Sequence, residues 1–313
     1  MTARKSLLKG KKRKDAIFVA LVLLWPIAHF AVFKIAMNVS MISMSFYNGN
    51  LMSPMVYVGW ENYADIFRMF AGTKTAGINN PAALWNALSL IPLSLFINMP
   101  LTLLFSFAVF RKYRCHRFFR IVLFIPSMMS AVVLCLLFKI AVSNKGFVNP
   151  LLEMVGLGGK IPLGGWLGSA ETAWGTILVF SVWTGISSNI IYFCSSMSRV
   201  PDSIIESAKL DGASELRLFL QIVMPLVWPT VTTMTVTGFS GCFGWFMPSL
   251  LMTQGGPDGA TSTLGLIITQ STKNSTSNLG FSAALGIVIS LFGGVTVVGL
   301  RKIMEKIFPE VEY

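Results

Sequence analysis

Charged side chains are scarce in this sequence, and acidic ones are the scarcest. Asp, Glu, Lys and Arg make up 12% of the 313 residues, and only 13 residues are acidic. An ordinary soluble domain carries about 25% charged residues. Hydrophobic residues make up 54% of the chain, and its mean hydropathy is +0.67. This balance excludes an ordinary soluble domain and indicates an integral membrane protein.

The residue sets that usually carry catalysis or bind metal are missing as well. The sequence contains four cysteines, Cys115, Cys135, Cys194 and Cys242. None of them forms a C-x-x-C pair, so we expect neither a disulfide nor a metal site. The two histidines, His29 and His116, are isolated from each other. No G-x-x-x-x-G-K-[ST] loop is present to cradle phosphates, so another chain must bind any ATP that drives this protein.

Long apolar runs separated by short polar segments fill most of the chain. We expect six spans, at about residues 16–38, 84–110, 121–138, 172–198, 229–252 and 279–300. Each is close to the roughly 20 residues that cross the hydrocarbon core of a bilayer. Pro126 lies inside the third run and predicts a kink in that helix. The predicted fold class is therefore an all-α integral membrane protein with six transmembrane helices.

The first apolar run has to be distinguished from a cleavable signal peptide. Seven Lys or Arg residues lie within residues 1–14, and the apolar run follows from Ala16, as in a signal peptide. No convincing small-x-small cleavage site closes the run, and apolar residues continue past Lys34 toward Phe46. We therefore interpret residues 16–38 as an uncleaved first span.

Basic residues are unevenly distributed among the segments that join the expected spans. The N-terminus, the 111–120 loop, the segment between the fourth and fifth spans and the tail contain 18 Lys and Arg, whereas the three other loops contain five. Loops rich in Lys and Arg stay in the cytoplasm, so both termini are predicted to be cytoplasmic. The net charge of +12 thus fits membrane topology and not nucleic-acid binding. The predicted organisation is a basic N-terminus at 1–15, a six-span domain at 16–303 and a tail at 304–313.

The most informative polar segment is residues 201–225, called the elbow here, which reads PDSIIESAKLDGASELRLFLQIVMP. Ser203 and Glu206 have the spacing of a capping box and predict the start of a short helix. Gly212 permits a left-handed backbone and predicts a turn. A second short helix is expected to end before Pro225. A DNA-binding helix-turn-helix is disfavoured, because both ends of the elbow continue into apolar runs of membrane-spanning length.

The elbow resembles the cytoplasmic EAA loop of ABC importer permeases, most closely that of the carbohydrate-uptake branch. The family pattern is roughly E-A-A, three residues, G, about nine residues and then I-x-L-P. The matching positions are Glu206, Ala208, Asp211, Gly212, Ala213, Phe219, Ile222 and Pro225. The departures are Ser207 for the middle alanine and Met224 for the leucine, both small changes in bulk.

Two further segments resemble elements of sugar permeases in this family. Residues 58–63, VGWENY, resemble the V-G-L-x-N-Y element that follows the first span, and residues 253–257, TQGGP, resemble the T-x-G-G-P turn after the fifth. With the elbow, they imply the type I ABC importer permease fold, with both termini cytoplasmic. The resemblance also implies a multi-pass protein of the bacterial or archaeal cell membrane.

The resemblance implies the import of oligosaccharides or related sugars by a chain that is not an enzyme and binds no cofactor itself. ATP and magnesium would be bound by a cytoplasmic ATPase dimer, whose closure would drive alternating access through the elbow. The other implied partners are a second homologous permease, an extracellular sugar-binding lipoprotein and membrane lipid. Nucleic acid is not an expected partner.

The resemblance assigns coupling to the ATPase to nine residues of the elbow. They are Glu206, Ser207, Ala208, Asp211, Gly212, Ala213, Phe219, Ile222 and Pro225. Glu206 would meet basic or polar groups on the ATPase, although it could instead only cap its own helix. Gly212 would set the turn, and Ala208 and Ala213 would allow close backbone approach. Phe219 could either pack inside this chain or contact the partner.

Candidate sugar contacts lie in the fourth and fifth spans. Sugars are commonly held by aromatic faces together with hydroxyl or amide groups, because a pyranose has apolar faces and polar edges. The candidates are Trp183, Thr184, Ser188, Cys242 and Trp245. The resemblance places them near cavity-lining positions of sugar permeases. They could instead be packing or lipid-facing residues, with specificity residing in the external binding protein.

Other functions stay open at this point. An ABC permease could carry another solute, such as a phosphorylated polyol or a peptide. A six-span secondary transporter or channel would not need the elbow, and ATP dependence of uptake distinguishes the two classes. A membrane enzyme is disfavoured, because the spans contain no clustered polar residues, no paired carboxylates and no Ser/His/Asp set.

Overall fold

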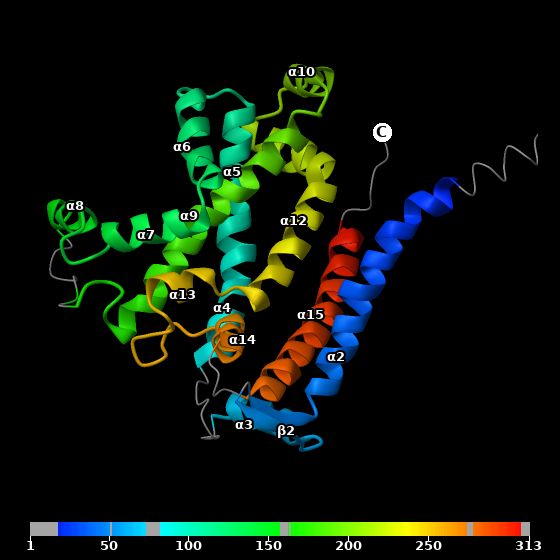
Figure 1. Ribbon diagram of the computed structural model, residues 1–313. Helices are drawn as coiled ribbons and strands as arrows, with labels where there is room; N and C mark the ends of the chain where they lie inside the picture. Colours follow the sequence, from blue (N-terminus) through cyan, green and yellow to red (C-terminus); the bar gives the residue numbers. More distant parts are fainter. Residues whose placement is uncertain are drawn as a thin grey trace, which may run out of the picture. The chain divides into compact units, whose positions relative to one another are not determined.

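The computed structural model describes residues 18–50, 52–72, 82–156, 162, 164–273 and 278–307. Within these residues, five helices are long and apolar enough to cross a membrane, and there are six spans if one sharply bent helix pair counts as a single crossing. The five are Phe18–Met44, Ala82–Phe110, Ala170–Met197, Glu215–Gly244 and Leu279–Ile307. The fold is helical, as predicted, apart from one small β-hairpin (Figure 1).

Contacts within the chain divide it into two units, and each is described by itself. The first unit comprises residues 1–66 and 274–287. Its elements are η1 (a π-helical turn, Ala31–Ala36), α2 (Met37–Met44), β1 (Tyr47–Asn50), β2 (Ser53–Tyr57), α3 (Glu61–Phe70) and the beginning of α15 (Leu279–Ile307). The first long helix reaches Met44, so the prediction that it ends near residue 38 is too short. The strands pair antiparallel, with Tyr47 opposite Tyr57.

The side chain of Asn62 connects segments of the first unit through hydrogen bonds. Its side chain is buried, and its Nδ2 donates hydrogen bonds to the carbonyl oxygens of Ser45 and Tyr47, both at 2.8 Å. Its Oδ1 accepts a hydrogen bond from Nδ2 of Asn278 at 3.0 Å. An amide offers both donors and an acceptor, so one side chain satisfies backbone groups on one side and a second amide on the other. The VGWENY segment therefore joins α2, β1 and the start of α15.

The second unit comprises residues 67–273 and 288–313. Its first elements are α4 (Ala82–Pro92), η2 (π-helical, Leu93–Asn98), α5 (Met99–Phe110), α6 (His116–Met128), α7 (Ala131–Ala141), α8 (Val148–Met154) and α9 (Ala170–Met197). The predicted second and fourth spans are confirmed as the helices 82–110 and 170–197. They pack so closely that a Cβ at Gly185 of α9 would clash with the side-chain amide of Asn98. Small residues permit such close approach between membrane helices.

The third span is not the single kinked helix predicted for residues 121–138. The helix α6 runs through Pro126 and ends at Met128, and α7 starts at Ala131 with a bend of 111° between the two. Pro126 has no N–H to donate to the preceding turn, which weakens the helix at this point. The extended backbone of Met129 and Ser130 then makes the break. The bend follows the proline by three residues and does not occur at it.

The elbow and the fifth span form one continuous helix after the turn at Gly212. Before the turn lies α10 (Asp202–Leu210). The continuous helix after the turn consists of α11 (Glu215–Arg217), η4 (π-helical, Leu218–Val223) and α12 (Met224–Gly244). The prediction of a helix that ends before Pro225 is therefore wrong. The N–H of Met224 bonds back to the carbonyl of Phe219, five residues earlier, so the π-helical turn shifts the hydrogen-bond ladder just before the proline. Pro225 then lies in the first turn of α12, where its missing N–H costs little.

The chain after α12 also differs from the prediction of a fifth span at 229–252. The helix ends at Gly244, and a short helix α13 (Met247–Met252) follows an extended Trp245. The TQGGP turn leads to α14 (Leu264–Lys273), a helix between the fifth and sixth spans that is not predicted from the sequence. Nδ2 of Asn86 donates to the carbonyl oxygens of Ala260 and Ser262, at 2.7 and 2.8 Å. These bonds attach the segment between the turn and α14 to α4.

Candidate functional site

The turn of the elbow is defined by its backbone hydrogen bonds. Gly212 has φ +76°, the left-handed conformation that the sequence predicts there. The N–H of Ala213 donates to the carbonyl of Ala208, and that of Gly212 to the carbonyl of Lys209, both at 3.0 Å. This pair of bonds is the Schellman motif that ends many helices, and it favours glycine at the left-handed position. The first arm of the elbow is therefore one short helix, α10, with a fixed C-terminal turn.

The N-terminal end of α10 differs from the predicted capping box. The helix begins at Asp202, its N-cap is Pro201, and no side chain caps it. Pro201 is extended, with φ −61° and ψ 136°, and its carbonyl already accepts the N–H of Ile204. Because the helix starts two residues earlier than a Ser203 cap requires, Ser203 lies inside its first turn and cannot reach the N–H that a cap would bind. Glu206 is therefore not engaged as a capping residue.

The helix α10 has one face toward the bundle and one toward the outside. Ile205 and Ala208 are buried in a hydrophobic cluster that also contains Phe107 of α5 and Phe193 of α9. Leu210 is 89% exposed. Figure 1 shows α10 beyond the ends of α5 and α12. The elbow thus presents an outer surface that no described part of this chain covers.

The structure places the nine predicted coupling residues in three groups. The exposed residues are Glu206, Ser207, Asp211 and Gly212. The buried residues are Ala208 and Phe219. The partly buried residues are Ala213, Ile222 and Pro225. Phe219 packs on Phe107 with ring centroids 4.8 Å apart, so it belongs to the interior of this chain.

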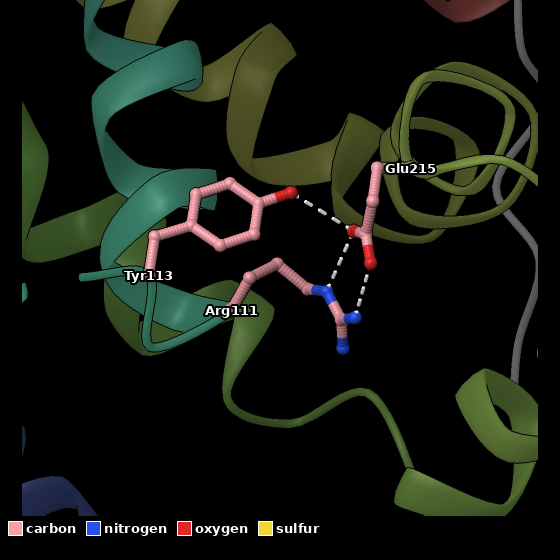
Figure 2. Close-up of polar contacts among 3 residues, drawn as sticks. All are labelled: Arg111, Tyr113 and Glu215. Carbon is pink, nitrogen blue, oxygen red and sulfur yellow. Dashed lines mark hydrogen bonds and ion pairs between the residues drawn. The ribbon is translucent and has the colours of Figure 1, made fainter.

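A second attachment of the elbow comes from three polar side chains that the sequence does not single out (Figure 2). The guanidinium of Arg111 donates two hydrogen bonds to the carboxylate of Glu215, from Nε at 2.9 Å and from Nη2 at 2.6 Å. The hydroxyl of Tyr113 donates to the same carboxylate at 3.0 Å. Arg111 and Tyr113 follow the end of α5, and Glu215 begins α11. The cluster therefore ties the second arm of the elbow to the end of the second span.

The protonation states of this cluster follow from its contacts. The hydrogen bond to Glu215 raises the pKa of the Arg111 guanidinium, which keeps this side chain charged. Burial raises the pKa of the Tyr113 hydroxyl, and the hydrogen bond to Glu215 acts in the same direction. Tyr113 therefore stays protonated and keeps donating. A two-pronged guanidinium–carboxylate pair is more directional than a lysine pair would be.

The five candidate sugar contacts do not all meet in one place. Thr184, Ser188 and Trp245 line a cavity of about 330 Å³ beside the break between α6 and α7. Trp183 stacks instead on Phe138, with ring centroids 6.4 Å apart. Cys242 is buried and donates its thiol to the carbonyl of Gly238 at 3.2 Å. Three of the five predicted residues therefore line one cavity, and the other two pack elsewhere.

The walls of this cavity include residues that the sequence does not indicate. Pro126, Ser127 and Met129 come from the bend of the third span, and Phe246 and Met247 from the break after α12. Both breaks interrupt helices that the sequence predicts as continuous. No pattern of residue types marks the cavity, because it exists only where two broken helices meet.

Metal binding finds no support in the part of the chain that the structure describes. No group of three or more His, Cys, Asp or Glu side chains is close enough there to hold a metal ion. The described residues thus offer an exposed elbow surface, a helix-end ion pair and a cavity with aromatic and hydroxyl groups.

Comparison with known proteins identifies the family. Residues 91–307 match the model of the binding-protein-dependent transport system inner membrane component. The chain is 26% identical over 298 residues to the sulfoquinovosyl glycerol transport system permease protein of Agrobacterium fabrum, covering 93% of this chain and 88% of the relative. It is 26% identical over 295 residues to the arabinooligosaccharides transport system permease protein of Bacillus subtilis, covering 91% and 86%.

A solved structure shows the same fold. A chain of the bacterial alginate ABC transporter, crystallised in complex with an alginate pentasaccharide-bound periplasmic protein, superposes with a TM-score of 0.76. The superposition covers 96% of this chain and 99% of that chain, at 19% sequence identity. This likeness supports the membrane fold assigned above. The chain belongs to the inner membrane components of binding-protein-dependent ABC transport systems: it is a multi-pass permease subunit of the cell membrane that works with a binding protein and with other subunits, one of which is the separate ATPase.

Proposed function

We propose that this permease imports oligosaccharides or related sugars. Relatives that match most of the chain are named for sulfoquinovosyl glycerol and for arabinooligosaccharides, both sugar derivatives. The cavity beside the bend supports this substrate class, because Trp245 offers an aromatic face and Thr184 and Ser188 offer hydroxyl groups. A sugar ring presents apolar faces and polar edges to such a site.

We propose that the elbow transmits movement of the ATPase to the membrane-spanning helices. The observation that carries this is its arrangement: α10 is exposed on one face, yet fixed at its turn by Gly212 and along its inner face by Ile205 and Ala208. A docked ATPase that moves α10 would therefore also move α5 and α9, which share its hydrophobic cluster. Glu206 and Asp211 are exposed carboxylates on either side of Leu210, and they would meet polar or basic groups on the ATPase.

The remaining partners follow from the same proposal. A cytoplasmic ATPase dimer would bind ATP and magnesium, a second homologous permease would complete the transmembrane path, and an extracellular sugar-binding lipoprotein would deliver the sugar. The elbow and both termini would be cytoplasmic, with segments 1–15 and 304–313 flanking the six-span domain 16–303. Residues 1–17 and 308–313 lie outside the described residues.

Replacement of Gly212 tests the coupling role. In the Schellman motif both N–H groups after the helix are used, so Gly212→Pro removes one donor and forbids a positive φ. We expect normal membrane insertion and complex assembly but loss of ATP-driven sugar uptake in proteoliposomes. Gly241→Ala is the matched control, because a Cβ at 241 meets nothing within 4 Å. Full uptake by a well-inserted Gly212→Pro transporter would refute the coupling role.

Energy dependence separates this proposal from a secondary transporter. Uptake by the intact complex is expected to require ATP hydrolysis and to be indifferent to a proton or sodium gradient. Uptake driven by an ion gradient without ATP would contradict the proposal. A radiolabelled sugar in proteoliposomes with ATP sealed inside or omitted gives the answer.

A further inference from the structure

A second cavity, of about 790 Å³, lies at the end of the bundle beside the elbow. Its walls come from the end of α5, from Arg120 and Phe124 of α6, from the C-terminal part of α9 and from α10. The spans α5 and α9 end at Phe110 and Met197, so the cavity lies at the level where apolar helix gives way to polar chain. In a bilayer this level is the head-group region.

The charge around this cavity is strongly positive. Its lining contains five cationic side chains, Arg111, Lys112, Arg120, Arg199 and Lys209, and two carboxylates, Asp202 and Glu206. The lining alone has an excess of three positive charges, and the excess is two when Glu215, the carboxylate outside the lining that pairs with Arg111, is counted as well. Among the described residues, no ion pair within 4.0 Å involves Lys112, Arg120, Arg199 or Lys209. Such a group of like charges is stabilised when an anion lies between them.

The cavity also has an apolar side. Phe124 of α6 and Ile191 of α9 line it, and the guanidinium carbon of Arg120 lies 5.6 Å from the centre of the Phe124 ring. Outside the cavity, α6 continues with exposed Ile121 and Ile125. Arg120 therefore marks the boundary between a cationic and an apolar wall.

Hydroxyl groups complete the polar wall. Ser195 and Ser198 line the cavity beside Arg199, and the hydroxyl of Ser198 donates to the carbonyl of Ser195 at 2.8 Å. The proton of the Ser198 hydroxyl is used in that bond, so the donors that suit the oxygens of a phosphate ester are the guanidinium and ammonium groups and the Ser195 hydroxyl. Basic pockets between membrane helices on the cytoplasmic side commonly bind the head groups of anionic lipids.

We propose that this cavity binds the phosphate head group of an anionic phospholipid such as phosphatidylglycerol. The phosphate would lie among Arg120, Arg199 and Lys209, and an acyl chain would follow the apolar side of α6 from Phe124. A free phosphate would satisfy the cationic wall but would leave the apolar wall unused. Because Asp202, Glu206 and Lys209 belong to α10, the bound lipid would rest directly against the elbow.

The experiment measures lipid retention on the intact transporter, purified with its partner subunits. The delipidated complex is titrated with phosphatidylglycerol or phosphatidylcholine, and bound lipid is counted by native mass spectrometry. The wild type is expected to retain phosphatidylglycerol in preference to phosphatidylcholine. Removing one guanidinium, in Arg120→Gln or Arg199→Gln, should weaken that retention by about fivefold.

Controls separate this site from general surface charge. Arg117→Gln removes a guanidinium from the same helix, outside the cavity lining, and should leave retention unchanged. Arg120→Lys keeps a cation and should retain most of the lipid, which distinguishes lost charge from misfolding. Equal retention of the two lipids, or equal retention by Arg120→Gln and Arg117→Gln, would overturn the proposal.

Two further measurements identify the source of the phosphate and test whether the cavity is accessible in the assembled transporter. Inorganic phosphate at millimolar concentration should not displace the lipid; displacement would mean that a free phosphate, and not a lipid, is the ligand. The isolated permease and the full complex should bind phosphatidylglycerol alike. Binding that is lost in the full complex would mean that another subunit covers the cavity, and the lipid site would be refuted for the assembled transporter. Neither outcome depends on whether the cargo is a sugar.

Discussion

Arg111 and Glu215 are 104 residues apart in the sequence and share two hydrogen bonds, at 2.6 and 2.9 Å. Arg111 is the first residue after α5, and Glu215 is the first of α11, so the pair joins the end of one span to the second arm of the elbow. The Arg111 side chain is 13% exposed and that of Glu215 is 47% exposed. The pair therefore lies near the protein surface. There it fixes the position of the second arm of the elbow and adds little to the free energy of unfolding.

Glu215→Gln is expected to reduce transport more than stability. The amide keeps the size of the side chain but cannot form the two-pronged charged pair with Arg111. Because the pair is partly exposed, the loss of unfolding free energy should be about 1 kcal/mol or less. We expect ATP-driven uptake to fall several-fold while complex assembly is kept, measured in proteoliposomes together with the melting temperature.

The matched control for this prediction is Glu305→Gln. It removes the carboxylate of the exposed Arg301–Glu305 pair near the end of α15, and it should leave uptake unchanged. The exchange Arg111→Glu with Glu215→Arg should restore part of the activity that each single change removes. Single and double changes that are simply additive would show that the two residues act independently.

The sequence predicts the spans of this protein well, because a membrane requires long apolar runs with few alternatives. It does not predict where those runs break. The proline at 126 is visible in the sequence, yet the helix continues to Met128, and the backbone becomes extended only at Met129 and Ser130. Pro225 gives the opposite error, because a π-helical turn before it lets the helix continue. Both outcomes depend on hydrogen-bond ladders and packing that no single residue type specifies.

The candidate site likewise contains features that the sequence predicts and features that it does not. The left-handed turn at Gly212 is predictable, because few residues other than glycine adopt φ +76° readily. The Arg111–Glu215 pair is not, because each is one charged residue among several in its loop, and only the fold brings them together. The sugar candidates are predicted from residue type and from the family resemblance, and in the structure Trp245 lines the cavity whereas Trp183 stacks on Phe138.

Gly185→Ala is expected to destabilise the bundle through one defined contact. A Cβ at this position would overlap Nδ2 of Asn98, whose Oδ1 already accepts a hydrogen bond from Thr102 at 3.2 Å. Overpacking of this kind costs about 1–3 kcal/mol. The measurement is thermal unfolding of the purified complex.

A second substitution shows whether that contact is the cause. Asn98→Ala removes the overlapping amide, so the pair Gly185→Ala with Asn98→Ala should be more stable than Gly185→Ala alone. Gly175→Ala is the control, because it lies on the same helix and a Cβ there meets nothing within 4 Å. A double variant no more stable than Gly185→Ala would mean that the clash arises elsewhere.

Trp245→Ala is expected to change how the transporter handles its sugar. Trp245 lines the cavity beside the bend and lies edge-on to Trp174, with ring centroids 6.1 Å apart. Loss of one aromatic face in a binding pocket should raise the apparent KM by about tenfold. The measurement is uptake at saturating binding protein over a range of sugars.

Trp183→Ala is the matched control for the cavity, because Trp183 stacks on Phe138 and does not line it. It should leave the apparent KM and the range of transported sugars unchanged. If the two tryptophan variants behave alike, or if Trp245→Ala has no effect, the cavity is not part of the sugar path.

Leu210→Ser is expected to weaken docking of the ATPase without affecting the fold. Leu210 is 89% exposed at the end of α10, one residue before the turn, and a large apolar side chain in that position has no packing role within the described chain. Surface substitutions of this kind change stability by about 0.5 kcal/mol or less. An interface, by contrast, depends strongly on a few buried apolar side chains. Co-purification of the ATPase should therefore fall while the melting temperature of the permease stays the same.

Leu151→Ser, at an exposed position of α8, should change neither quantity. Unaltered ATPase retention by Leu210→Ser would place the docking surface on the carboxylates of α10 and not on its apolar end.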